Sequence, residues 1–174
     1  MFVTHQLSIE EVNNLLSESF VRIFGNIVEH YPAAAISILK CRPFSDANSL
    51  VQAIYDVLDT LRVNEKESIL QQYPDIFDSL FACYRPVILE KEAEEIFSGT
   101  SQLSAEDKRK LMELNARYKE KYGFPFIIGT KKNNVYNVFS EIMLRLQNSR
   151  EDEIHRAIRE VKNIVYLRVH DIIC

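Results

Sequence analysis

The sequence is poor in the residues that interrupt regular structure. It holds four glycines and five prolines among 174 residues, and they stand singly at the apparent ends of helical patterns. Such a chain has no room for Pro-rich or Gly/Ser-rich linkers, and no repeat of fixed period is visible. The length suits one globular core, so we expect a single domain over residues 1–174.

Long apolar runs and an excess of positive charge are also absent. No uninterrupted apolar stretch approaches the roughly 20 residues of a membrane helix, and the opening MFVTHQL lacks the pattern of a signal peptide. The net charge is -4, with acidic and basic residues interspersed, which disfavours binding to nucleic acid. We expect neither a nucleic-acid nor a membrane partner, and a cytoplasmic location, because the ending HDIIC is no peroxisomal signal.

Cysteine and histidine are too few and too scattered for a metal site. Cys41, Cys83 and Cys174 are odd in number and lack CxxC spacing, which is typical of reduced thiols. No two histidines have the spacing of a metal-binding helix. The sequence also lacks a Walker loop, a dinucleotide fingerprint and a G-x-S-x-G elbow. We therefore expect no metal and no cofactor.

What the chain does contain is helical periodicity. Apolar residues recur every three or four positions, and Ser or Asn stands three residues before Asp or Glu at several helix starts. This pattern predicts an all-α bundle of about eight helices, and a strand within 165–169 is less favoured than helix. Helices are expected after Ser8, over 19–29, after Pro32, over 48–61, from Asn64 with Glu67 as its capping box, over 87–97, over 104–122, over 135–146 and after Ser149.

The stretch from Leu114 to Lys132 stands out. A charged helix ends at Gly123, and the most apolar extended run of the chain follows over Phe124–Gly129. This run is either the wall of a buried site or a core segment behind a helix cap. The acidic run at 90–95 is typical of a solvated helical face.

Four blocks of sequence resemble, in order, the 2-oxo-4-hydroxy-4-carboxy-5-ureidoimidazoline (OHCU) decarboxylases. They are GNIVEHYP (25–32), RPF (42–44), YPDI (73–76) and LNARYKEKYGFPFIIG (114–129), and the closing REDEIHRAIREVKNIVYLRVHDI is similar too. The resemblance implies an all-α homodimer without cofactor. It further implies a lyase of urate degradation that converts the ureidoimidazoline into (S)-allantoin with loss of carbon dioxide.

The resemblance also assigns site residues. The family's HPDL block reads Tyr73-Pro74-Asp75-Ile76 here, so Tyr73 stands where the family has its catalytic His. Counting back from Gly99, the family's Glu falls on Glu94 and its Ser on Lys91, while its Arg falls on Lys131. The implied catalytic residues are Tyr73 and Glu94, and the implied substrate-binding residues are Pro74, Lys91, Phe126, Ile127, Ile128 and Lys131.

These replacements leave two functions open. An unperturbed tyrosine titrates near ~10, so it donates a proton at neutral pH but is a poor base, and losing an acid–base group costs about 10²- to 10⁴-fold in rate. Lys keeps the charge of Arg but loses its two-pronged grip on a carboxylate. The first hypothesis is a decarboxylase of weak or altered activity, with Tyr73 or His30 supplying the proton. The alternative is an inactive homologue that binds an allantoin-like ligand or a protein partner.

Overall fold

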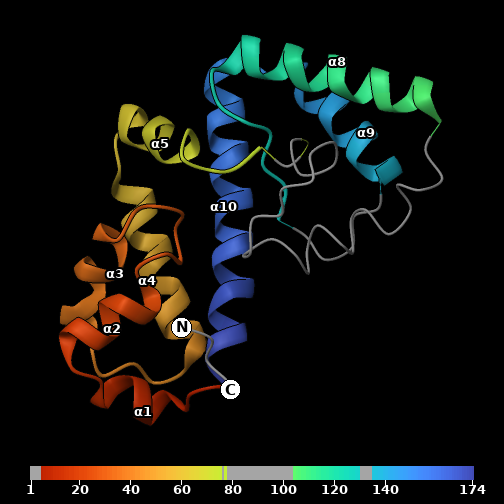
Figure 1. Ribbon diagram of the computed structural model, residues 1–174. Coiled ribbons are helices and arrows are strands. Elements are labelled where there is room, and N and C mark those ends of the chain that lie inside the picture. Colours follow the sequence, from red (N-terminus) through yellow and green to blue (C-terminus); the bar gives the residue numbers. More distant parts are fainter. Residues whose placement is uncertain (1–4, 76, 78–103, 130–134) are drawn as a thin grey trace. The chain divides into compact units, whose positions relative to one another are not determined.

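The computed structural model describes residues 5–75, 77, 104–129 and 135–174, and the regular structure within them is helical (Figure 1). The all-α prediction is thereby confirmed. The chain divides into two compact units, the first formed by Met1–Gln72 with Val161–Cys174 and the second by Tyr73–Glu160. The C-terminal helix α10, Arg150–Ile172, contributes its first part to the second unit and its last part to the first.

The first unit begins with the predicted capping box. The Ser8 hydroxyl accepts the Glu11 amide at 3.1 Å, and the Glu11 carboxylate accepts the Ser8 amide at 2.8 Å. The helices that lie wholly in this unit follow one another along the chain with short connections. They are α1 (Ile9–Asn14), α2 (Ser17–Phe24), α3 (Ala33–Ile38), the 3₁₀ turn η1 (Leu39–Cys41), α4 (Ala47–Thr60) and α5 (Val63–Leu70).

Helix α2 is shorter than the sequence predicts. It ends at Phe24, yet Ile27 and Val28 beyond it are buried, so the apolar positions were right and the helical bound was wrong. The reason is local competition for the backbone, because the Asn26 side chain accepts the amide of His30 at 2.8 Å. His30 itself has a positive φ of 50°.

The predicted capping box of Asn64 and Glu67 is wrong. Helix α5 begins at Val63 with Arg62 as its N-cap, two residues before the predicted cap, so Asn64 lies inside its first turn. The Glu65 carboxylate accepts the amide of Arg62 at 2.8 Å and takes the place expected for Glu67. A Glu was available at the third helical position from either start, and spacing alone could not choose between them.

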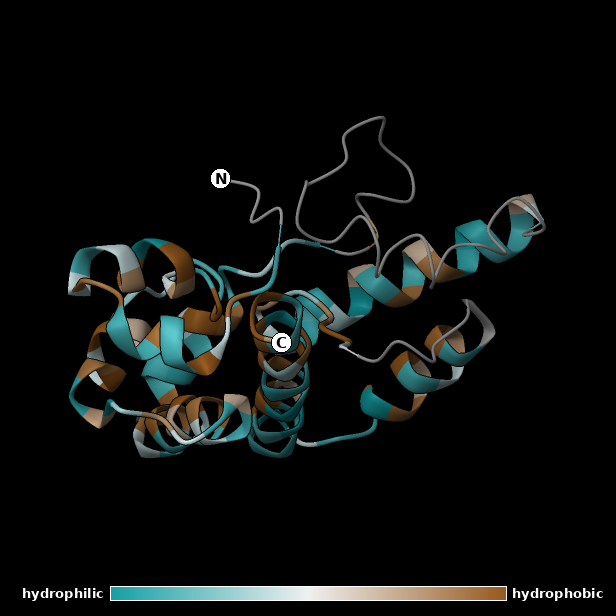
Figure 2. Ribbon diagram, turned by 90° about the horizontal axis from the view of Figure 1, so that it is seen from below, coloured by the Kyte–Doolittle hydropathy of each residue, from teal (hydrophilic) through white to brown (hydrophobic). Residues whose placement is uncertain are grey.

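The core of the first unit is apolar. Helix α3 packs on α2 and α4, and the Phe20 ring lies 4.7 Å from Phe24 and 6.4 Å from Phe44 between centroids. Figure 2 shows hydrophobic and hydrophilic stretches along the helices, as amphipathic packing requires. The last part of α10 is helical to Ile172, so the prediction of helix over strand at 165–169 is confirmed.

The second unit contains α8 (Ala105–Tyr122), α9 (Val135–Arg145) and the first part of α10. Ser104 caps α8 by accepting the Asp107 amide at 3.1 Å, and Gly123 ends it with a φ of 80°, both as predicted. Ser149 accepts the Asp152 amide at 3.1 Å where α10 begins. These caps place Phe124–Gly129, which has no regular structure, directly after α8.

Candidate active site

The loop that carries Tyr73 follows α5 and opens the second unit. Tyr73 is 5% exposed, so this predicted catalytic residue is buried rather than on the surface. Pro74 and Asp75 continue the loop without regular structure. Proline limits the backbone here, which favours one fixed path for the loop.

Asp75 ties this loop to helix α8. Its carboxylate accepts Lys119 Nζ at 2.7 Å, Asn115 Nδ2 at 3.1 and 3.3 Å, and the Phe77 amide at 2.9 Å. Burial raises the pKa of the carboxyl, but the hydrogen bonds from Lys119, Asn115 and Phe77 outweigh burial and leave the pKa below its usual value. Asp75 is thus an anion that three donor contacts hold against α8, with a fourth from the Phe77 amide.

The contact with Asp75 leaves the other end of the Asn115 amide unsatisfied among the described residues. Asn115 is 7% exposed, and within the described part of the chain its Oδ1 has no hydrogen-bond partner. Turning the amide over would place that oxygen against the Asp75 carboxylate, so the orientation with Nδ2 toward Asp75 is the favourable one. A buried acceptor left unsatisfied costs about 1–3 kcal/mol.

Most side chains of the segment Phe124–Gly129 are buried. Phe124, Phe126, Ile127 and Ile128 are between 1% and 7% exposed. The Phe126 ring meets the Tyr118 ring edge-on at 5.3 Å and stacks with the Phe77 ring at 6.0 Å between centroids. Because Phe77 follows the Tyr73 loop, the structure brings the YPD block and the FPF block together.

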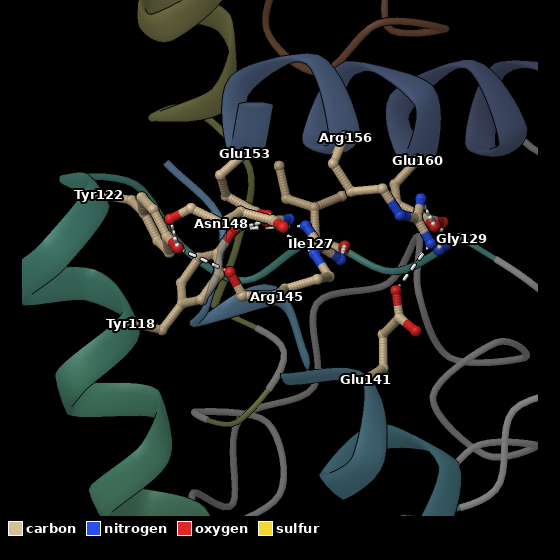
Figure 3. A network of polar contacts seen from close by, with 10 residues as sticks. All are labelled: Tyr118, Tyr122, Ile127, Gly129, Glu141, Arg145, Asn148, Glu153, Arg156 and Glu160. Atoms are coloured by element: carbon tan, nitrogen blue, oxygen red, sulfur yellow. Dashed lines mark hydrogen bonds and ion pairs between the residues drawn. The ribbon is translucent and has the colours of Figure 1, made fainter. Parts of the chain in front are cut away.

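The backbone of this segment is held by charged side chains, as Figure 3 shows. Arg145 Nη1 donates to the Ile127 carbonyl at 2.6 Å, and Glu160 accepts the Gly129 amide at 2.9 Å. The Arg145 guanidinium also lies 4.4 Å from the centroid of the Phe126 ring. A segment outside any helix or sheet must find such partners for its buried polar groups.

Arg145 belongs to a buried network between α8, α9 and α10. It donates to Glu153 at 2.6 Å and to the Tyr118 hydroxyl at 3.3 Å, and Tyr118 in turn donates to Glu153. Asn148 adds a further donor to Glu153 at 2.9 Å. Burial raises the pKa of Tyr118 far above its ordinary value, against the opposing charge of Arg145, so Tyr118 stays a hydrogen-bond donor.

Tyr122 closes the same network toward the end of α9. Its hydroxyl lies 2.6 Å from the Arg145 carbonyl oxygen and 2.8 Å from the Asn148 carbonyl oxygen, and it donates to one at a time. Burial, with the nearby Glu153 charge, raises the pKa of Tyr122 to about 12. Both tyrosines of the LNARYKEKY block are therefore part of the scaffold.

Glu160 has a second ion pair. Arg156, one turn earlier on α10, pairs with Glu160 and reaches Glu141 of α9 at 2.7 Å (Figure 3). Glu160 is 1% exposed, so its charge is compensated by Arg156 and used on the Gly129 amide. Gly129, the last residue of the segment, is thereby held to α10 directly and to α9 through Arg156.

The sequence-predicted site residues divide into two groups. Tyr73, Pro74, Phe126, Ile127 and Ile128 belong to the second unit, all but Pro74 being buried. The other three lie outside the described residues, namely Lys91, Glu94 and Lys131, as does the helix expected over 87–97.

Several polar residues of the site were missed by the sequence reasoning. Asn115 and Lys119 are four residues apart on α8, and Asn115 interrupts the otherwise apolar buried face of that helix, which was an available signal. Arg145, Glu153 and Glu160 gave no such signal, because charged residues on amphipathic helices usually face water.

Two absences hold for the described part of the chain. No group of three or more His, Cys, Asp or Glu side chains there could hold a metal ion. Among the helices described, none is both long and apolar enough to cross a membrane.

Comparison with known proteins gives one consistent result. The family model of the OHCU decarboxylases matches residues 13–170. The OHCU decarboxylase of Amia calva is 35% identical over 167 residues, covering 96% of this chain and 95% of that protein. The Xenopus laevis enzyme of the same name is 33% identical, with coverage of 95% and 94%.

Solved structures show the same fold. A crystal structure of (S)-allantoin synthase superposes with a TM-score of 0.78 at 19% identity, covering 96% of this chain and 54% of that one, so this chain spans about half its length. A crystal structure of an OHCU decarboxylase in the presence of (S)-allantoin gives a TM-score of 0.66 at 19% identity, with coverage of 86% and 96%. On the family match and the two relatives, the chain belongs to the OHCU decarboxylase family.

Proposed function

We propose that this chain decarboxylates 2-oxo-4-hydroxy-4-carboxy-5-ureidoimidazoline to (S)-allantoin in urate degradation. The observation that carries the proposal is the family match over residues 13–170, together with relatives of the same name along nearly the whole chain. The joining of the YPD loop to the FPF segment, through Asp75 with Asn115 and Phe77 with Phe126, supports it.

The reaction is acid–base chemistry that needs no redox step. The bond from the ring carbon to the carboxylate breaks, carbon dioxide leaves, and the electron pair delocalises into the adjacent imidazoline carbonyl system. A proton must then reach one face of that carbon, and its source sets the handedness of the product. We assign this delivery to the Tyr73 hydroxyl, which solvent reprotonates afterwards.

The buried segment serves this step by excluding water. Phe126, Ile127 and Ile128 are held in one position by Arg145 and Glu160, so they offer a rigid apolar wall. We propose that Lys131, which follows this segment in the sequence, balances the negative charge of the substrate. Glu94 and Lys91, the two remaining positions of the family site, complete the proposed set.

The rest of the proposal concerns the assembly. Residues 1–174 act as one decarboxylase domain, whose ligand is of the allantoin type and whose expected state is a cytoplasmic homodimer. Sedimentation of the purified chain tests the dimer directly. The alternative of an inactive binding module is supported by none of the relatives' names, which are those of decarboxylases and of a urate-degradation protein.

The experiment generates the substrate in place. Urate is oxidised in the presence of urate oxidase and hydroxyisourate hydrolase, and circular dichroism follows the allantoin that forms, since spontaneous decay gives the racemate. The wild-type chain at micromolar concentration is expected to produce the (S) product faster than the blank. Tyr73→Phe, which keeps the ring and removes the hydroxyl, is expected to lose about 10²- to 10⁴-fold in rate.

Tyr73→His is the matched variant, since it restores the family's residue. Because His titrates close to working pH, it is expected to equal or exceed the wild type. A Tyr73→Phe variant as fast as the wild type would remove Tyr73 from the chemistry. No turnover by wild type and Tyr73→His alike would contradict the decarboxylase proposal.

A further inference from the structure

Three side chains from two distant parts of the chain meet beside Tyr73. Asp75 stands two residues after it, and its partners Asn115 and Lys119 stand one turn apart on α8. All three belong to the second unit. We call Asp75, Asn115 and Lys119 the loop clamp.

The loop clamp is a poor device for stability alone. Lys119 is 45% exposed, and an ion pair with one partner in water contributes little. Asn115 leaves its Oδ1 without a hydrogen-bond partner among the described residues, which makes burial of the amide unfavourable. Buried groups left unsatisfied in this way gather where a geometry has to be held for function.

What the loop clamp does achieve is a fixed loop geometry. The carboxylate of Asp75 accepts from Asn115 and Lys119 of α8 and from the Phe77 amide, so Asp75 is held to one helix and the chain after it is tied to Asp75. Only one residue, Pro74, separates this anchor from Tyr73, and the backbone of this proline is restricted. Little freedom is left for the tyrosine.

We propose that the loop clamp positions Tyr73 for proton delivery, with Asn115 and Asp75 as positioning residues of the decarboxylase. This inference rests on the proposed function. The reason is geometric, because a proton donor displaced by about 1 Å can lose about 10²-fold in rate while substrate binding is kept.

The test exchanges the two partners. In Asp75→Asn either orientation of the new amide sets an NH₂ group against a donor, and Asn115→Asp sets two carboxylates against each other. The double variant restores the pairing with its polarity reversed, since the new amide donates to the new carboxylate and still accepts the Phe77 amide. Lys119 then pairs with position 115 at i, i+4 along α8.

Each single variant is expected to lower kcat by about 10- to 10²-fold with KM within about twofold, and the double variant to recover most of the loss. Circular dichroism of the product, read at enzyme levels where spontaneous decay is negligible, gives kcat and the (S) excess together. Lys110→Met, which removes an exposed ion pair with Glu106 on the same helix, is the control and is expected to leave both unchanged.

The outcomes separate the two proposals. Single variants that lower the urea midpoint but keep kcat would make the loop clamp merely structural and overturn the inference. A folded double variant that recovers no kcat would overturn it as well. Absence of turnover by the wild type would instead contradict the proposed function, and the positioning role would then be refuted as well.

Discussion

In each unit an Arg–Glu pair holds a segment without regular structure, and these two pairs, Arg168 with Glu29 and Arg145 with Glu153, differ in burial. In the first unit Arg168 binds Glu29 at 2.7 Å and donates to the Asn26 carbonyl at 2.8 Å. In the second, Arg145 binds Glu153 and donates to the Ile127 carbonyl, each at 2.6 Å. The side chains are 11% and 7% exposed in the first pair and 1% and 0% in the second.

This difference indicates where the fold needs an exact backbone position. Removing a charge pair fully from water is expensive, and it is tolerated when additional hydrogen bonds satisfy both ions. Glu153 accepts such hydrogen bonds from Tyr118 and Asn148, and Arg145 donates one to the Ile127 carbonyl. The more costly pair therefore supports the segment proposed as the site wall.

The largest effect is expected when the deeper pair is broken. Arg145→Met leaves the Glu153 charge buried and the Ile127 carbonyl without its donor, so unfolding free energy should fall by about 3–5 kcal/mol. Urea denaturation followed by circular dichroism measures it. Adding Glu153→Leu removes the stranded charge and should recover part of the loss. A loss below about 1 kcal/mol for Arg145→Met would break the comparison.

Arg168→Met tests the shallower pair in the same way. Its charged hydrogen bonds are closer to water, which can solvate Glu29 after the change, so the expected loss is about 2 kcal/mol. The same urea measurement applies. A loss of unfolding free energy equal to that of Arg145→Met would show that burial does not decide which pair stabilises the protein more.

The Asp75 contact adds a pH dependence to the second unit. Its folded pKa is lowered, so its stabilisation is full above the unfolded value of about 3.9 and is lost as pH falls through the folded pKa. Asp75→Asn should cost about 1–2 kcal/mol at pH 7. The gap between variant and wild type in urea midpoint should narrow steadily below about pH 4. A gap independent of pH would contradict the ion-pair account.

Gly123→Ala is expected to have the smallest effect. Gly123 has a φ of 80°, and the nearest atom that an added Cβ would meet is 3.9 Å away on Arg150. Space is sufficient, so the cost is the left-handed backbone alone, about 1 kcal/mol. Thermal unfolding detects this. A loss of several kcal/mol would show that the turn into Phe124 tolerates no adjustment.

The sequence predicted most of the helices and their caps, because periodicity and capping are local properties. Ser8, Ser104 and Ser149 begin helices as expected, and Gly123 ends one. At α2 the Asn26 side chain accepts the His30 amide in place of a helical partner, and at α5 a Glu stands at the third helical position from either possible start. Those choices depend on packing rather than on spacing.

The site was predictable only in part. Tyr73 and the Phe126 segment were assigned to the site through their motifs and stay predictions there, whereas the contact of Asp75 with Asn115 joins residues 40 positions apart. Glu153 lies in the acidic first turn of α10 and reads as a solvated residue that favours the helix start, yet it is fully buried. Which charge turns inward depends on the neighbouring helices.

The most direct test of the central claim is the handedness of the allantoin produced by the wild-type chain. A decarboxylase with a fixed proton donor is expected to produce allantoin with an (S) excess. This excess should rise with protein concentration until spontaneous decay is negligible. A racemic product at every protein concentration, from a chain shown to be folded by circular dichroism, would contradict the claim.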